Sequence, residues 1–104
     1  MKLLHSKNEL SVPPSARSDA KAMELIRAWA AHGGLHCSLN VDNWGENERL
    51  GWGILLSDVA RHVANALNEQ KGWDKAETIR EIRRVFNAEL DSPTAEPSGE
   101  FLKH

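Results

Sequence analysis

The residues whose chemistry stands out lie in the stretch Gly33–Gly53. It holds the single cysteine of the chain, Cys37, directly after His36, together with two of the four tryptophans. Cysteine and histidine side chains bind zinc when three or four donors converge on one point. His32 and His36 have the i, i+4 spacing of two ligands on one helix, but the two glycines between them break such a helix. We therefore predict no metal site.

Cys37 is also a candidate nucleophile. Residues 35–42 alternate apolar and polar side chains, which is the pattern of a half-buried strand. Cys37 then points with the apolar set toward the core, and His36 points the other way. A reactive thiolate needs exposure and a nearby cation or helix N-terminus, and a core-facing cysteine in mid-strand has neither. The sequence therefore assigns no catalytic residue, indicates no cofactor and favours a protein that is not an enzyme.

A small-ligand site remains open on the outward face of this strand and on the polar loop after it. Trp44 lies in that loop, and an indole offers a large apolar face with one N–H donor. His36 is the candidate base, because an unperturbed imidazole titrates near pH 6.5. The candidate residues are His36, Ser38, Asn40, Asp42, Trp44, Arg49 and His62. Such a site requires that these side chains surround one pocket.

Three amphipathic helices are expected around the strand. Apolar residues recur at helical spacing in residues 16–32, 52–71 and 74–90. Gly33-Gly34 and Gly72 end the first two helices, since glycine tolerates the left-handed conformation of a C-cap. Asp74 is placed to cap the third helix. Leu50–Ile54 also alternates, so a second strand or the start of a helix is open there.

The predicted fold class is α+β, with three amphipathic helices on a small sheet that has one clear central strand, residues 35–42. A strand by itself leaves backbone groups unpaired, which is costly when they are buried. Leu10–Val12, Leu50–Ile54 or the same strand of a second copy could supply the partner. Pairing with Leu10–Val12 would make a parallel β-α-β crossover, and pairing with a second copy would make a homodimer through edge strands.

The chain divides into a single globular domain and two ends. Residues 1–9 are expected to be a mobile N-terminus, residues 10–91 the α+β domain, and residues 92–104 a disordered tail unless Phe101 and Leu102 dock. A length of 104 residues is that of one domain.

Composition and net charge argue against a nucleic-acid-binding protein and against a membrane protein. The formal net charge of -2 gives no general attraction to nucleic acid or to anionic membranes. Arg80, Arg83 and Arg84 form a basic edge on the last helix, but glutamates are interspersed among them, so nucleic-acid binding is the third interpretation. A lone cysteine, an N-terminus without an apolar signal segment and the lack of a long apolar run together predict a cytoplasmic protein that does not cross a membrane.

The segments "HGGLHCSLNVDNW" and "WGILLSDVARHVANAL" carry a resemblance. The chain resembles, over about residues 10–91, a family of short bacterial proteins classified only as a domain of unknown function. The shared landmarks are the Gly33-Gly34 break, the strand, the Trp52-Gly53 helix entry and the Asp58…Arg61-His62 pattern. The resemblance implies an intact domain that stands by itself, and it implies no activity.

The functional interpretation is a non-enzymatic interaction or regulatory module that acts as a homodimer or binds another protein. The chain is short, spends nearly all its apolar residues on a core and shows no catalytic cluster. The alternative is a small-ligand-binding protein or modest enzyme that uses the polar face of strand 35–42 and the loop 43–51.

Overall fold

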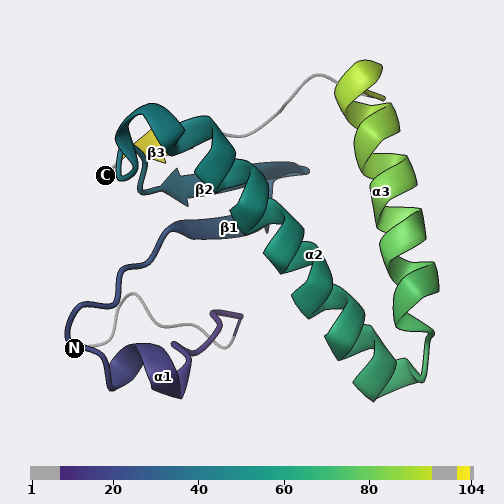
Figure 1. Cartoon of the computed structure of the whole chain (residues 1–104), viewed down its shortest axis with the longest axis horizontal. Coiled ribbons are helices and arrows are strands. Elements are labelled where there is room, and N and C mark those ends of the chain that lie inside the picture. Colours follow the sequence, from purple (N-terminus) through teal and green to yellow (C-terminus); the bar gives the residue numbers. More distant parts are fainter. Residues whose placement is uncertain (1–7, 95–100, 104) are drawn as a thin grey trace.

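The computed structural model describes residues 8–94 and 101–103, and it confirms the α+β class. A small sheet lies beside the first half of one long helix, and a second long helix returns from the far end of that helix at an angle, so that the two helices separate away from their connecting turn (Figure 1). The elements in chain order are α1 (Pro14–Arg17), β1 (Ile26–Ala31), β2 (Gly34–Leu39), the 3-10 helix η1 (Gly45–Asn47), α2 (Glu48–Lys71), α3 (Lys75–Asp91) and β3 (Phe101–Lys103).

The sheet is built on an antiparallel hairpin. β1 pairs with β2 so that Ile26 lies opposite Leu39 and Ala31 lies opposite Gly34. The prediction of a single clear strand over residues 35–42 is corrected, because β2 ends at Leu39 and pairs along its whole length with β1, a strand that the sequence pattern did not predict. The backbone of residues 101–103 adds a short parallel piece, β3, along β2. Expectations for residues 1–7, 95–100 and 104 fall outside the described residues.

The helix predicted over residues 16–32 is wrong. α1 covers only Pro14–Arg17, and β1 occupies the end of the predicted helix. His32 and Gly33 have φ values of 52° and 74°, which are the two positive φ values that a tight hairpin turn between twisted strands requires. The local propensity and pattern of this alanine-rich segment favour a helix, so its pairing with β2 overrode the local preference. Leu10–Val12 lies outside every strand, and no β-α-β crossover forms in the described part of the chain.

The predictions for the two long helices are confirmed. Gly72 ends α2 in the left-handed conformation, with φ 70°. The Asp74 carboxylate caps α3 by accepting the backbone N–H of Glu77 at 2.9 Å. α2 begins at Glu48, so the open question about Leu50–Ile54 is settled in favour of helix.

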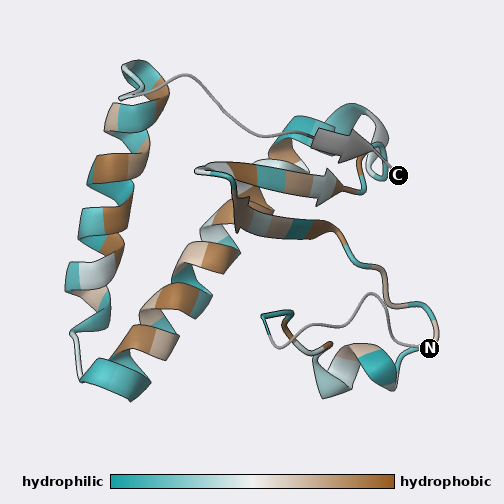
Figure 2. Cartoon of the chain, turned by 180° about the vertical axis from the view of Figure 1, so that it is seen from behind, coloured by the Kyte–Doolittle hydropathy of each residue, from teal (hydrophilic) through white to brown (hydrophobic). Residues whose placement is uncertain are grey.

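The chain encloses almost no core, which overturns the expectation that its apolar residues fill one. Among residues 8–94, Ala64 on α2 is the one fully buried residue, with 2% of its surface exposed. Apolar positions recur along both long helices (Figure 2). The large apolar side chains that remain exposed are Leu10, Val12, Met23, Trp29, Leu35, Leu50, Ile54, Leu56, Val59, Val63, Trp73, Val85, Phe86 and Leu90.

Candidate functional site

One carboxylate organises the loop between β2 and α2. Glu48 Oε2 accepts the backbone N–H of Asp42 at 2.8 Å and the indole N–H of Trp52 at 2.8 Å. Glu48 Oε1 accepts the backbone N–H groups of Asn43 at 2.9 Å and of Trp44 at 3.0 Å. Four donors therefore converge on a single half-buried side chain, and they fix the loop on the first turn of the helix.

These contacts decide the ionisation of Glu48. Desolvation by itself would raise the pKa of this carboxyl, but the hydrogen bonds from Asp42, Trp44, Trp52 and Asn43 outweigh it and hold the pKa below its ordinary value of 4.5. The charged form is favoured because every donor points at an oxygen that carries negative charge. The loop is therefore held by an ionised glutamate at neutral pH.

The Trp44 indole closes over the start of α2. Its ring meets the Trp52 ring edge to face, with centroids 5.9 Å apart and planes at 65°. It also lies on Gly51, where a Cβ atom would collide with the indole ring. Position 51 therefore requires glycine, because the indole of Trp44 approaches the helix backbone closely.

Sequence analysis did not identify Glu48 or Gly51 as functional positions. The available signal for Glu48 was its place in the first turn of a helix, where an acidic side chain interacts favourably with backbone N–H groups that have no partner within the helix. The signal for Gly51 was a glycine inside a helical pattern, which often has a packing reason.

An apolar groove runs along α2 next to this loop. Its volume is about 700 Å³, and it includes two of the predicted ligand residues, Trp44 and His62. Leu25, which directly precedes β1, forms the opposite side. The lining residues are Leu25, Trp44, Asn47, Leu50, Gly51, Ile54, Leu55, Asp58, Val59 and His62. The groove is an apolar surface with a few polar groups, which is the composition of small-molecule sites in general.

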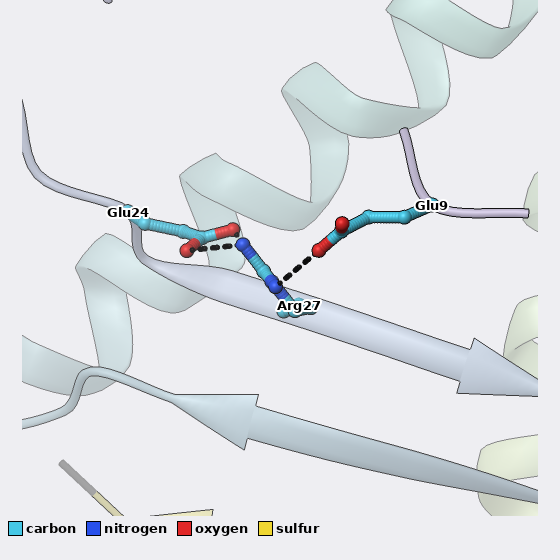
Figure 3. A network of polar contacts seen from close by, with 3 residues as sticks. All are labelled: Glu9, Glu24 and Arg27. Carbon is cyan, nitrogen blue, oxygen red and sulfur yellow. Dashed lines mark hydrogen bonds and ion pairs between the residues drawn. The ribbon is translucent and has the colours of Figure 1, made fainter. Parts of the chain in front are cut away.

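Ser38 and Asn40 line a different and smaller cavity. It has a volume of about 200 Å³ and is shared with Glu24, Ile26 and Arg27. Arg27 lies between two carboxylates (Figure 3). Its Nε and Nη2 donate to Glu24, each at 3.1 Å, and its Nη1 donates to Glu9 at 3.0 Å.

The hydrogen bonds and the charge of Glu24, aided by Glu9, raise the pKa of Arg27 above its already high ordinary value. This network ties the chain before α1 to the edge strand β1. The single guanidinium is shared by two carboxylates, so these three side chains carry an excess of one negative charge beside the Ser38 hydroxyl and the Asn40 amide.

The remaining predicted residues line neither cavity. His36 contacts the Ala31 carbonyl oxygen through Nε2 at 3.1 Å and lies edge to face with His32, with ring centroids 6.4 Å apart. His36 and Cys37 are both half-buried. As neighbours in β2, the two side chains point to opposite faces of the sheet as predicted, but their exposure does not distinguish an interior thiol from an exterior imidazole.

Asp42 has a φ of 72° and uses its backbone N–H to hold Glu48, and Arg49 is exposed on α2. The seven predicted residues are thus divided between two cavities and the rest of the surface.

Other chemistries find little support in the part of the chain that the structure describes. Residues 8–94 contain no group of three or more histidine, cysteine, aspartate or glutamate side chains that could hold a metal ion. On α3, Arg80 pairs with Glu77 and Arg84 pairs with Glu81, so two of the three basic residues are neutralised on their own helix. None of the described helices combines the length and the apolar composition that a membrane crossing requires.

Comparison with known proteins places the chain in a family. A solved structure from the photosynthetic bacterium Rhodopseudomonas palustrus CGA009, provisionally described as a pyruvate dehydrogenase, is similar with a TM-score of 0.65 and 29% sequence identity. The similarity covers 89% of this chain and 93% of that one. No curated protein matches the sequence. Residues 9–94 match the family described as a domain of unknown function, DUF5076, and the chain belongs to that family.

Proposed function

We propose that this protein is a non-enzymatic interaction module that completes its core by pairing with a second copy of itself. The observation that carries the proposal is the burial of Ala64 alone among residues 8–94. Burying apolar surface is the main favourable term in folding, and large contiguous apolar surfaces are rare on monomers. A second copy supplies the missing cover without any other component.

The exposed area supports this proposal. The chain exposes 9171 Å², whereas a compact monomer of its mass, 11.6 kDa, exposes about 5,800 Å². A standard interface takes about 800 Å² from each partner, and obligate dimers take more. The area includes the terminal residues outside the described part, so the surplus is an upper bound on what a second copy covers, and one such interface fits within it.

The test is the mass of the full chain in solution. Light scattering after gel filtration, repeated from low to high micromolar concentration, is expected to give twice the 11.6 kDa of the chain. A single-copy mass at high micromolar concentration, with the helices intact by circular dichroism, would overturn the proposal.

The non-enzymatic part has its own test. Oxidative decarboxylation of pyruvate needs a cofactor that stabilises a carbanion, such as thiamine diphosphate. We expect no pyruvate-dependent reduction of an electron acceptor by the purified dimer supplied with this cofactor. Turnover under these conditions would contradict the proposal and would favour the activity provisionally given to the Rhodopseudomonas protein.

A second candidate function is the binding of a small apolar ligand in the groove beside Trp44. The observation in its favour is that the groove brings Trp44 and His62 together although they are far apart in sequence. A thermal-shift screen of a metabolite library tests it, because a ligand that prefers the folded state raises the melting temperature. The shift should be lost in His62→Gln and retained in Arg49→Gln, because Arg49 lies outside the groove. A screen without any shift would remove this candidate.

A further inference from the structure

The middle of α2 carries an apolar stripe made of Leu56, Val59, Val63 and Ala66. These residues are spaced by three, four and three positions, which is the spacing of the contact line between two paired helices. All four are exposed, and the three larger ones have exposed fractions of 41%, 44% and 41%. The stripe contains no charged residue. It is therefore suited to pack against another helix.

A neighbouring line of α2 residues is covered. Ala60, Ala64 and Leu67 follow the same alternating spacing and are half-buried or buried. The helices α2 and α3 are in contact within the chain. α2 thus has two lines at helix-pairing spacing, and in the described part of the chain only this one is covered.

We propose that the α2 stripes of two copies pair antiparallel, so that Leu56 packs on Ala66 of the partner subunit and Val59 packs on the partner's Val63. This inference rests on the proposed self-association and names the surface that carries it. The stripe runs from a large residue, Leu56, to a small one, Ala66. In an antiparallel pair, the large side chain of one copy lies opposite the small side chain of the other. The packed volume is then even along the interface, as a close-packed core requires.

The placement of the sheet also favours the antiparallel direction. The sheet and Leu25 lie beside the first half of α2, and the second half extends past the sheet with α3 (Figure 1). Parallel pairing would bring the two sheets to the same end of the dimer. Antiparallel pairing lays the extended half of each α2 beside the sheet-bearing half of the other copy, where apolar surface is available.

The proposed register can be read by cross-linking. In antiparallel pairing, position 56 lies next to position 66 of the partner but is offset by ten residues, about 15 Å along the axis, from the partner's own position 56. A disulfide forms only when the two Cα atoms are within about 7 Å. Single cysteines at these positions therefore cannot bridge the dimer, whereas a chain with both can. The two positions are also too far apart on one helix for a bridge within a chain.

The experiment uses the full chain in a Cys37→Ser background, with Leu56→Cys, with Ala66→Cys and with both substitutions. Circular dichroism first checks that each variant is folded, and each is then oxidised with oxidised glutathione and run on a non-reducing gel. The expected result is a covalent dimer of the double variant and monomers of both single variants. A second pair, Val59→Cys and Val63→Cys, is tested on separate chains, because these two positions lie about 6 Å apart on one helix and could bridge within a chain. The two single variants refolded together are expected to form covalent dimers, whereas neither variant does so by itself.

The outcomes separate this inference from the proposed function. Covalent dimers of the single variants would show parallel pairing and overturn the inference. A dimer by light scattering that never cross-links, with either cysteine pair, would place the interface elsewhere and overturn the inference while the proposed function stands. A monomer by light scattering in the unmodified protein would overturn both.

Discussion

The first turns of α2 and its middle differ in how far other parts of the chain contact their side chains. In the first turns, Glu48, Gly51 and Trp52 are all engaged by the loop before the helix, through four hydrogen bonds and the packed Trp44 ring. In the middle, the stripe from Leu56 to Ala66 faces solvent. The same helix is thus completed by its own chain at one end and left open farther along.

This difference shows how local and distant contacts share one helix. The loop and the helix start are close in sequence, so their hydrogen bonds form at a small entropic cost of loop closure. No described segment of the chain covers the stripe, and its four residues are exposed. Substitutions in the two regions should therefore act on different properties, stability within the chain in one case and association in the other.

The largest expected effect is that of Val59→Glu in the middle of the stripe. A charge buried without a partner costs several kcal/mol, so we expect the dissociation constant of the dimer to rise about 100-fold or more. Light scattering over a concentration series measures the change.

The matched control is Asn65→Glu, which adds the same charge at an exposed position outside the stripe. It should leave the dimer intact. Equal behaviour of the two variants would contradict the division between the two regions of α2.

Next in size is Glu48→Gln at the helix start. The amide retains one acceptor oxygen and places an NH₂ group against donors, so the loop loses about half of its hydrogen bonds. The folded pKa of Glu48 lies below its ordinary value, so its stabilising effect is present above pH 4.5 and is lost as the pH falls through the folded pKa. Thermal melts from pH 7 to pH 3 should show an acid-dependent loss in the unmodified protein that is smaller in this variant.

The control for the pH-dependent melts is the neighbouring carboxylate, Glu46. It lies in η1 and is exposed, and we expect Glu46→Gln to keep the acid-dependent loss of the unmodified protein. In both variants the mass by light scattering should stay that of the dimer. Dissociation of Glu48→Gln at neutral pH would mean that the loop and the stripe are not independent.

Two glycines in the first turns of α2 give a test of opposite signs. Alanine normally stabilises a helix interior relative to glycine by about 0.5–1 kcal/mol, and Gly53→Ala should do so because nothing lies near its Cβ position. Gly51→Ala should instead destabilise by about 1–3 kcal/mol, because the new methyl group displaces the Trp44 indole. Denaturant unfolding measures both values, and a stabilising Gly51→Ala would contradict the close packing of Trp44.

The smallest expected effect is that of Asp74→Ala at the start of α3. Loss of the cap on the Glu77 N–H should lower the free energy of unfolding by about 1 kcal/mol. The variant lies outside both regions of α2, so it serves as a baseline for purely local destabilisation. Its melting temperature should fall while its mass by light scattering stays unchanged, and a change in mass would show that local stability alone controls association.

Sequence reasoning predicted the two long helices well and the N-terminal third badly. Asp74 and Gly72 mark helix ends by chemistry that acts within a few residues, so their roles could be read directly. Ile26–Ala31 is rich in alanine, which favours helix locally, and it is a strand because it pairs with β2. Of the seven predicted ligand residues, only the pairs Trp44 with His62 and Ser38 with Asn40 share a cavity, because the path of the chain through space decides which side chains meet.

The amino-acid sequence by itself determined the α+β class, the helices α2 and α3 with their caps, and an apolar stripe at helix-pairing spacing. These features depend on propensity and periodicity, which act over a few turns. The tertiary structure decided that the stripe stays exposed, that Glu48 collects four donors and that Gly51 must accept the Trp44 ring. These features depend on which surfaces the folded chain covers and which donors it brings to one point, and neither follows from the order of residues along a segment.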